Sequence, residues 1–218
     1  MRYALMAALI GSTAIAAPAF AQDANPTFTG PRVGVIVGYD NIRPGSSEDT
    51  DLDNDDEDTD GFLYGVEAGY DVAVGNKAVV GIEGELSDST AETDPYDGDA
   101  QFGYGNVETG RDLYIGARAG ILATPSTLVY AKGGYTNARL DLTTDYGERI
   151  NDEHYNLDGY RIGAGVEQAI GGNAYAKVEY RYSNYGDARL EFDDGSNTDN
   201  FSVDTDRHQL VAGVGMRF

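Results

Sequence analysis

The C-terminal stretch His208-Gln-Leu-Val-Ala-Gly-Val-Gly-Met-Arg-Phe218 alternates between two faces with a period of two residues. One face carries His208, Leu210, Ala212, Val214, Met216 and Phe218, and the other carries Gln209, Val211, Gly213, Gly215 and Arg217. In a soluble sheet the apolar face would pack against a core formed by other elements. Here the split recurs along the chain with charges on the second face, which predicts a barrel that is apolar towards lipid and polar towards its lumen.

Eight segments show this alternation, each near the length that a tilted membrane strand requires. They are residues 32–40, 62–70, 78–86, 111–121, 128–137, 160–168, 174–183 and 208–218. Three short connections, at 74–77, 123–126 and 170–173, have the composition of tight turns. The sequence therefore predicts an all-β fold, an eight-stranded antiparallel up-and-down transmembrane β-barrel with long acidic extracellular loops and short periplasmic turns.

The predicted loops hold most of the acidic residues. The chain has a net charge of -22, and residues 41–60, 87–110, 141–158 and 187–206 contain 28 of its 37 Asp and Glu but only three of its Lys and Arg. Nucleic-acid binding needs clustered basic residues, so a nucleic-acid partner is not expected.

Aromatic residues occur at both ends of the predicted strands. Those at the loop ends are Tyr39, Phe62, Tyr135, Tyr160 and Tyr182, and those at the turn ends are Tyr70 and Phe218. Two belts of aromatic rings are typical of a barrel in a bilayer. The alternative, a soluble barrel of the lipocalin type, would place its apolar residues inside, whereas the inward face here is charged.

The N-terminal residues have the features of an export signal. An apolar run follows Arg2, and Ala19-Phe-Ala21 matches the small-residue pattern that signal peptidase reads. The alternative, a membrane anchor helix, is weaker because the apolar run is short for a span. We expect residues 1–21 to be a cleaved signal peptide, 22–29 a short periplasmic segment and 30–218 the outer-membrane barrel.

Charged residues of both signs fall on the inward face of the predicted strands. They are Glu67, Glu83, Glu85, Glu167 and Glu179, with Arg118, Lys132, Arg161, Lys177, Arg181 and Arg217. Eight strands leave an interior only wide enough for side chains, and unpaired buried charge is costly. The favoured interpretation is a structural network of ion pairs, and the alternative is a narrow ion pathway.

The segment Ala174-Tyr-Ala-Lys-Val-Glu-Tyr-Arg-Tyr-Ser-Asn-Tyr-Gly186 resembles the penultimate strand of small eight-stranded barrels of the porin family, or OmpA-like group, of Gram-negative outer membranes. The preceding Gly163-Ala-Gly-Val-Glu167 and the terminal Phe218 extend the resemblance. It implies a location in the cell outer membrane and assembly by the barrel insertion machinery, with Phe218 as the recognised end. The sequence ends at Phe218, so we do not expect the peptidoglycan-binding role of relatives with an OmpA-like periplasmic domain, and the name porin is no evidence of transport.

Two features of the sequence could mark a chemical site. Residues 56–67 fit the calcium-loop pattern D-x-[DN]-x-[DN]-G-x5-E, but no helices flank them and Glu67 should point into the lumen. His154 and His208 lack a serine two residues later, which the barrel lipid A deacylases use, and there is no room for the ten strands of the barrel proteases. We expect no catalytic residues, cofactor or metal site, although loose binding of divalent cations by residues 51–60 stays open.

The sequence thus predicts a monomeric barrel with a structural and surface-interaction role in the cell envelope. Its expected partners are outer-membrane lipid and lipopolysaccharide, which the acidic loops could reach through divalent cations. The alternative is a narrow porin-like channel for small solutes or ions.

Overall fold

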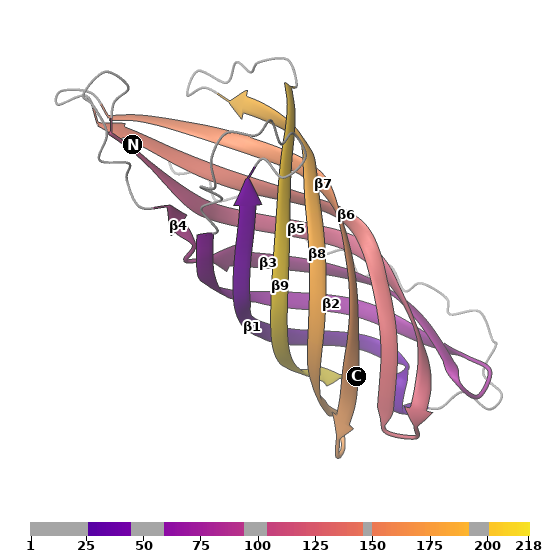
Figure 1. Ribbon diagram of the computed structural model, residues 1–218. Coiled ribbons are helices and arrows are strands. Elements are labelled where there is room, and N and C mark those ends of the chain that lie inside the picture. Colours follow the sequence, from indigo (N-terminus) through magenta and orange to yellow (C-terminus); the bar gives the residue numbers. More distant parts are fainter. Residues whose placement is uncertain (1–25, 45–58, 94–103, 146–149, 192–200) are drawn as a thin grey trace, which may run out of the picture.

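The computed structural model describes residues 26–44, 59–93, 104–145, 150–191 and 201–218 (Figure 1). A single 3-10 turn, η1 (Pro26–Phe28), precedes the strands. The strands are β1 (Gly30–Pro44), β2 (Thr59–Val74), β3 (Ala78–Ser89), β4 (Glu92–Thr93), β5 (Tyr104–Thr124), β6 (Thr127–Asp145), β7 (Ile150–Ile170), β8 (Ala174–Glu191) and β9 (Phe201–Arg217). Among these residues no helix is long and apolar enough to cross a membrane.

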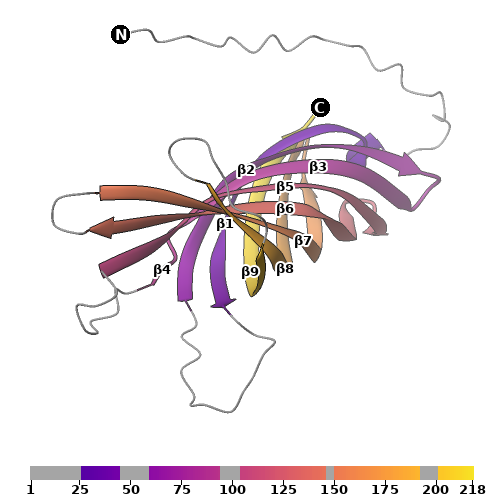
Figure 2. The same ribbon diagram turned by 90° about the horizontal axis from the view of Figure 1, so that it is seen from above.

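The strands close into a barrel through antiparallel pairing of neighbours in the chain. β1 pairs with β9 from Arg32 opposite Arg217 to Pro44 opposite Thr205, which joins the two ends of the sheet. β3 pairs directly with β5, and the two-residue β4 only extends that contact. The barrel therefore has eight strands, which cross it obliquely (Figure 1 and Figure 2), and the predicted fold class is confirmed. Within the described barrel wall each of the eight long strands pairs with a neighbour on both sides, as membrane insertion requires.

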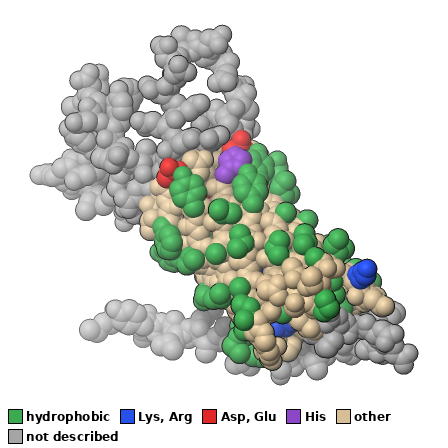
Figure 3. Space-filling view, turned by 60° about the horizontal axis from the view of Figure 1, so that its bottom comes forward, with side chains coloured by type: hydrophobic (Ala, Val, Ile, Leu, Met, Phe, Trp, Pro, Cys, Tyr) green, Lys and Arg blue, Asp and Glu red, His purple; other side chains and the backbone are tan. Residues whose placement is uncertain are grey.

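The side chains alternate between lipid and lumen as predicted. Along β1, Val35 and Val37 are 54% and 46% exposed, whereas Ile36 between them is 1% exposed. The same outward pattern covers the wall with hydrophobic side chains (Figure 3). An apolar exterior of this extent is stable only against hydrocarbon, so the wall is the membrane-facing surface.

The short connections lie at the same end of the barrel as the C-terminus (Figure 1). Gly75 has a φ of +61° in the β2–β3 turn, and Gly171 and Gly172 have φ values of +53° and +48° in the β7–β8 turn. Three residues connect the strands in each of these turns, 75–77 and 171–173. Tight hairpin connections need residues with positive φ, which glycine adopts without a steric penalty. The turns predicted from Gly-Asn and Gly-Gly are thus confirmed.

The strands are longer than the hydrophobic alternation predicted, and the loop boundaries were wrong. Residues 141–145 and 150–158, predicted as part of a loop, continue β6 and β7 in register with each other. His154, expected in that loop, therefore lies in β7. Beyond the bilayer the outward face no longer needs apolar residues, so the pattern disappears while the backbone hydrogen-bond ladder continues.

Candidate functional site

The barrel lumen is filled by sixteen charged side chains, all buried. The acids are Asp40, Glu67, Asp71, Glu83, Glu85, Asp112, Glu167 and Glu179, and the bases are Arg32, Arg118, Lys132, Arg161, Lys177, Arg181, Arg207 and Arg217. All eleven charged residues assigned to the inward face from the sequence lie there. Eight acids face eight bases, so the lumen is formally neutral although the chain carries a net charge of -22.

Five of the sixteen were not assigned to the network from the sequence. They are Arg32, Asp40, Asp71, Asp112 and Arg207. Each lies at or just beyond an end of a predicted strand, where hydrophobic alternation weakens. Residue parity could have identified them, because each is an even number of residues from an inward-facing residue of its own strand.

At the turn end, Asp71 is the acceptor for three arginines. Its Oδ2 lies 3.1 Å from Arg32 Nε, 2.5 Å from Arg118 Nη2 and 2.6 Å from Arg217 Nη1. Glu167 holds two of the same arginines, at 2.8 Å from Arg118 Nη1 and 2.7 Å from Arg217 Nη2. These contacts connect β1, β2, β5, β7 and β9 across the lumen, and each is a charge-assisted hydrogen bond.

In the middle of the lumen, Glu179 contacts three cations and one phenol. Lys132 Nζ lies 2.8 Å from Oε1 and Lys177 Nζ 3.5 Å from Oε2, and Arg181 Nε also donates to Oε1. Tyr130 donates its hydroxyl hydrogen to Oε2 at 2.6 Å. Each cation has a second carboxylate on another strand: Glu83 for Lys132, Glu67 for Lys177 and Glu85 for Arg181.

At the loop end, Asp112 and Asp40 share Arg207. Nη1 of Arg207 lies 2.8 Å from Asp112 Oδ2, while Nε and Nη2 donate to the two oxygens of Asp40 at 2.8 and 2.5 Å. Arg161 also pairs with Asp112, and its Nη1 reaches Glu85 Oε1 at 3.4 Å. This last contact joins the loop end to the middle, and Arg32 joins the turn end to the middle by pairing with Glu67 and Glu83 as well as Asp71. Ion pairs thus link all sixteen charges into one network.

Three buried tyrosines, Tyr114, Tyr130 and Tyr175, lie between these charges. Lys132 Nζ lies 4.7 Å from the centre of the Tyr114 ring, and the Arg118 guanidinium carbon lies 5.0 Å from that of Tyr130. Tyr175 donates its hydroxyl hydrogen to Glu67 Oε1 at 3.0 Å. The face of an aromatic ring attracts a cation, so these tyrosines stabilise the charged forms of the neighbouring lysine and arginine side chains. Their rings also fill volume in the lumen.

The turn end of the lumen is closed by a residue that precedes the first strand. Phe28 is fully buried and packs with Val79, Leu128 and Tyr130, which are inward-facing residues of β3 and β6. Its ring lies 5.8 Å from the guanidinium carbon of Arg217. The segment before the barrel therefore contributes a hydrophobic layer below the charged network.

The calcium-loop pattern does not form a site among the described residues. Glu67, which would be its last ligand, lies in the lumen and is bound to Lys177, Arg32 and Tyr175. This confirms the expectation that Glu67 points away from the loop, while residues 56–58 lie outside the described residues. No group of three acidic, histidine or cysteine residues suited to a metal ion occurs in the described ranges.

The described histidine side chain lies on the outer face. His208 Nδ1 is 2.7 Å from the Tyr180 hydroxyl oxygen, and its ring contacts that of Tyr182. These partners are phenols, and neither is a nucleophile paired with a base in the way that catalysis requires. The absence of enzymatic activity stays a prediction.

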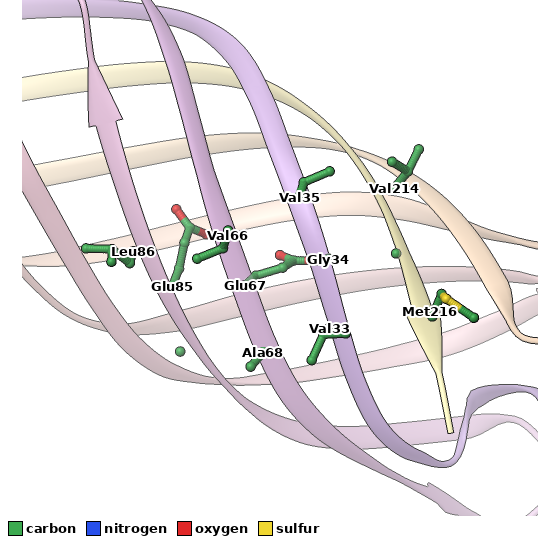
Figure 4. A pocket seen from close by; sticks show the side chains of 12 residues that line it. Val33, Gly34, Val35, Val66, Glu67, Ala68, Glu85, Leu86, Val214 and Met216 are labelled. Atoms are coloured by element: carbon green, nitrogen blue, oxygen red, sulfur yellow. The ribbon is translucent and has the colours of Figure 1, made fainter. Parts of the chain in front are cut away.

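One shallow hollow lies on the lipid-facing wall where β9, β1, β2 and β3 run side by side (Figure 4). It has a volume of about 720 Å³ and lies beside the outward-facing Val33, Val35, Val66 and Val214. Its lining includes small residues such as Ala68 and Gly34, which do not fill the hollow with side-chain atoms. Hydrocarbon chains fit this surface, and we assign it no chemistry.

Comparison with known proteins agrees with the geometry. The sequence model of the family described as "Outer membrane protein beta-barrel domain" matches residues 7–218. The chain is 30% identical over 200 residues to the 31 kDa outer-membrane immunogenic protein of Brucella melitensis biotype 1, covering 85% of this chain and 82% of that protein. It is 30% identical over 165 residues to the 22 kDa outer membrane protein of Rhizobium leguminosarum bv. viciae, covering 75% of this chain and 69% of that protein.

Among solved structures, Neisserial surface protein A superposes with a TM-score of 0.51 at 15% sequence identity, covering 87% of this chain and 98% of that chain. At this level of identity the likeness concerns the fold alone. The likeness agrees with the barrel fold that residue alternation predicts and strand pairing shows.

Proposed function

The chain belongs to the family of outer membrane protein β-barrel domains, and we propose that in the outer membrane it is a closed scaffold that presents surface loops. The observation that carries this proposal is the lumen, where eight acids and eight bases pair with one another and leave no net charge. A pore that selects ions uses rings of charge of one sign along an open path. Here charges of opposite sign fill the path and neutralise each other.

Two layers of side chains close the lumen, an ion-pair network and a hydrophobic layer below it, and this supports a structural role for the lumen. The ion-pair network spans from Asp40 at the loop end to Arg217 at the turn end, and Phe28 covers the turn end below it. Removing one partner from a buried ion pair leaves an uncompensated charge, so the network resists opening. An ion would have to displace several of these pairs to cross.

The experiment is single-channel recording from the refolded mature chain in a planar bilayer. Folding is first confirmed by heat-modifiable gel mobility, since a misfolded sample would also be silent. A closed scaffold gives no discrete conductance steps, and steps whose ion selectivity changes on charge reversal of Arg118 or Glu83 would contradict the proposal. Arg111→Gln is the matched control, because Arg111 is exposed on the outer face of the same strand as Arg118.

A narrow channel is the second candidate, and one observation favours it. Several buried lumen atoms have no hydrogen-bond partner, among them Tyr114 Oη, Ser87 Oγ and Gln209 Oε1. Buried polar atoms of this kind are commonly satisfied by water. A partly hydrated lumen could pass protons or small ions if the pairs rearranged, and the same recording tests this.

The working surface of the scaffold would be the loops. Residues 41–60 alone carry nine Asp and Glu, and we expect this acidity to bind divalent cations and, through them, the phosphates of lipopolysaccharide. The test is calcium-dependent binding of the folded barrel to lipopolysaccharide micelles, with the acids of 48–58 replaced by Asn and Gln. Equal binding by the neutralised variant would contradict a role for this loop.

A further inference from the structure

Four strand pairs are connected by the long loops, and three of them, β1–β2, β6–β7 and β8–β9, carry the same arrangement of three residues near the loop end of the lipid-facing surface. We call this arrangement the rim triplet. The rim triplets are Tyr39, Asn41 and Asp60; Tyr135, Asn137 and Asp158; and Tyr182, Asn184 and Asp206. In each, one aspartate oxygen accepts a hydrogen bond from the tyrosine hydroxyl and another from the asparagine amide. For Asp60 the two distances are 2.5 and 2.8 Å.

The strand register explains why the arrangement repeats. Asn41 lies directly opposite Asp60, and the other two asparagines lie directly opposite Asp158 and Asp206. Two residues nearer the membrane, each triplet tyrosine lies opposite another ring, which is Phe62, Tyr160 or His208. The motif is therefore Tyr-x-Asn on one strand facing Asp-x-ring on the next. It presents a fixed carboxylate just above a layer of rings.

Two of the rim triplets border hollows on the outer wall. The first hollow has a volume of about 510 Å³ and is lined by Tyr39, Asn41, Asp60, Tyr180, His208, Gln209 and Leu210. The second has a volume of about 590 Å³ and is lined by Leu113, Tyr114, Ile115, Tyr135, Asn137, Asn156 and Asp158. Gln209 and Tyr114 are buried on the lumen face, so what the two hollows share on the outer wall is the aspartate, asparagine and tyrosine of a rim triplet.

In the first hollow the polar and aromatic groups form two rows across the strands. Asp60, Asn41 and His208 are neighbours in register on β2, β1 and β9, and they make the row nearer the loops. Tyr39 and Tyr180 lie in the row nearer the membrane centre, on either side of Leu210. Figure 3 shows this kind of edge, where histidine and acidic side chains border the hydrophobic wall.

From this geometry we infer that the hollows beside the rim triplets bind the saccharide headgroups of glycolipids in the outer leaflet. Asp60 and Asp158 each use Oδ1 for the triplet, and Oδ2 makes no hydrogen bond within the described residues. A free carboxylate oxygen beside amides accepts sugar hydroxyls, and ring faces cover the apolar faces of a sugar. Aromatic rings at this level sit at the headgroup boundary of a bilayer.

Other ligand classes fit the hollows less well. No lysine or arginine lines the first hollow, so a phosphate there would meet only the negative charge of Asp60. Beside the second hollow, Arg111 Nη2 donates to Asn137 Oδ1 at 3.4 Å, so the argument against phosphate rests on the first hollow. One carboxylate in each hollow is also too few oxygen ligands for a divalent cation. This inference goes beyond the proposed function, because these residues lie on the wall below the loops and would act without cations.

The test measures lipid retained by the folded barrel after extraction from vesicles of phosphatidylcholine and digalactosyl diacylglycerol. The galactolipid that copurifies is quantified by mass spectrometry relative to phosphatidylcholine. We expect wild type to be enriched in the galactolipid, and the double variant Asp60→Asn/Asp158→Asn to lose about tenfold of that enrichment, since hydrogen bonds to a charged acceptor are lost.

Two further variants separate binding from folding. Asp88→Asn changes an acid at the rim of the remaining hairpin and should retain the enrichment, because among the described residues Asp88 Oδ1 accepts a hydrogen bond from the adjacent Ser89 amide and from no tyrosine or asparagine. Tyr180→Leu, outside the triplets, removes a ring from the first hollow and should lower the enrichment, and it decides the question if the double variant does not fold. The inference would be overturned by equal retention of both lipids by wild type, by unchanged enrichment in both the Asp60→Asn/Asp158→Asn variant and Tyr180→Leu, or by loss of the enrichment on adding a metal chelator.

Discussion

The guanidinium group of Arg207 holds the carboxylate of Asp40 by two hydrogen bonds, although 167 residues separate them in the chain. Both side chains are buried, and they lie on β9 and β1, the two strands whose pairing closes the barrel. A paired fork geometry of this kind is specific as well as strong. The last and first strands are thus joined by side chains inside the lumen and by their backbones.

Replacing Asp40 by Asn should destabilise the closed barrel. Arg207 would still pair with Asp112 but would lose the charged carboxylate that accepts two of its hydrogen bonds. We expect the free energy of unfolding to fall by about 2–3 kcal/mol. The measurement is urea unfolding in detergent micelles or bilayers. The double variant Asp40→Asn/Arg207→Gln should lose less than the sum of the two single variants, because neither charge is then left unpaired. If the changes in unfolding free energy of the two single variants simply add up in the double variant, Asp40 and Arg207 are not energetically coupled.

Phe28→Ala should weaken the barrel at its turn end. The ring is fully buried among Val79, Leu128 and Tyr130, so its removal leaves a cavity and should cost about 3 kcal/mol. Phe62→Ala is the control, because Phe62 is 53% exposed on the lipid-facing wall and should cost less. The readout is the temperature at which gel mobility changes. Because the ion-pair network remains above the cavity, the variant should still be electrically silent.

Adjacent glycines on β6 should respond differently to a methyl group. A Cβ on Gly134 would lie 2.2 Å from the carbonyl oxygen of Ile115, whereas one on Gly133 would lie 3.7 Å from its nearest neighbour. Gly134→Ala must push the β5 backbone away, and we expect a loss of about 1–3 kcal/mol. Gly133→Ala should be nearly neutral in the same urea titration. Equal effects of the two variants would mean that the close approach of β5 and β6 does not require glycine at position 134.

Phe218→Ala should slow assembly more than it lowers stability. The side chain is 65% exposed at the turn end, so the folded barrel loses little contact when it is truncated. We expect slower folding into vesicles that contain the insertion machinery, and nearly unchanged folding into vesicles without it. Equal rates in the first assay would contradict the proposal that this residue is a recognised assembly signal.

The fold followed from the sequence because a membrane barrel displays its pattern residue by residue. Val33, Val35 and Val37 face hydrocarbon on a strand whose intervening residues face the lumen, and one strand suffices to show it. Pattern reading failed beyond the bilayer, at residues such as Asp112 and Arg207. There the outward-facing residues are no more hydrophobic than the inward-facing ones, although the strands continue.

The sequence by itself determined which face of each strand is apolar, how many strands there are and where the tight turns lie, because alternation and glycine conformation are local properties. Only the tertiary structure decided that Asp71 meets three arginines, that Phe28 closes the lumen and that three rim triplets repeat around the wall. Those contacts depend on strand register and on the curvature of the closed sheet. Register and closure place residues far apart in the chain against each other, and a periodic pattern carries no information about that pairing.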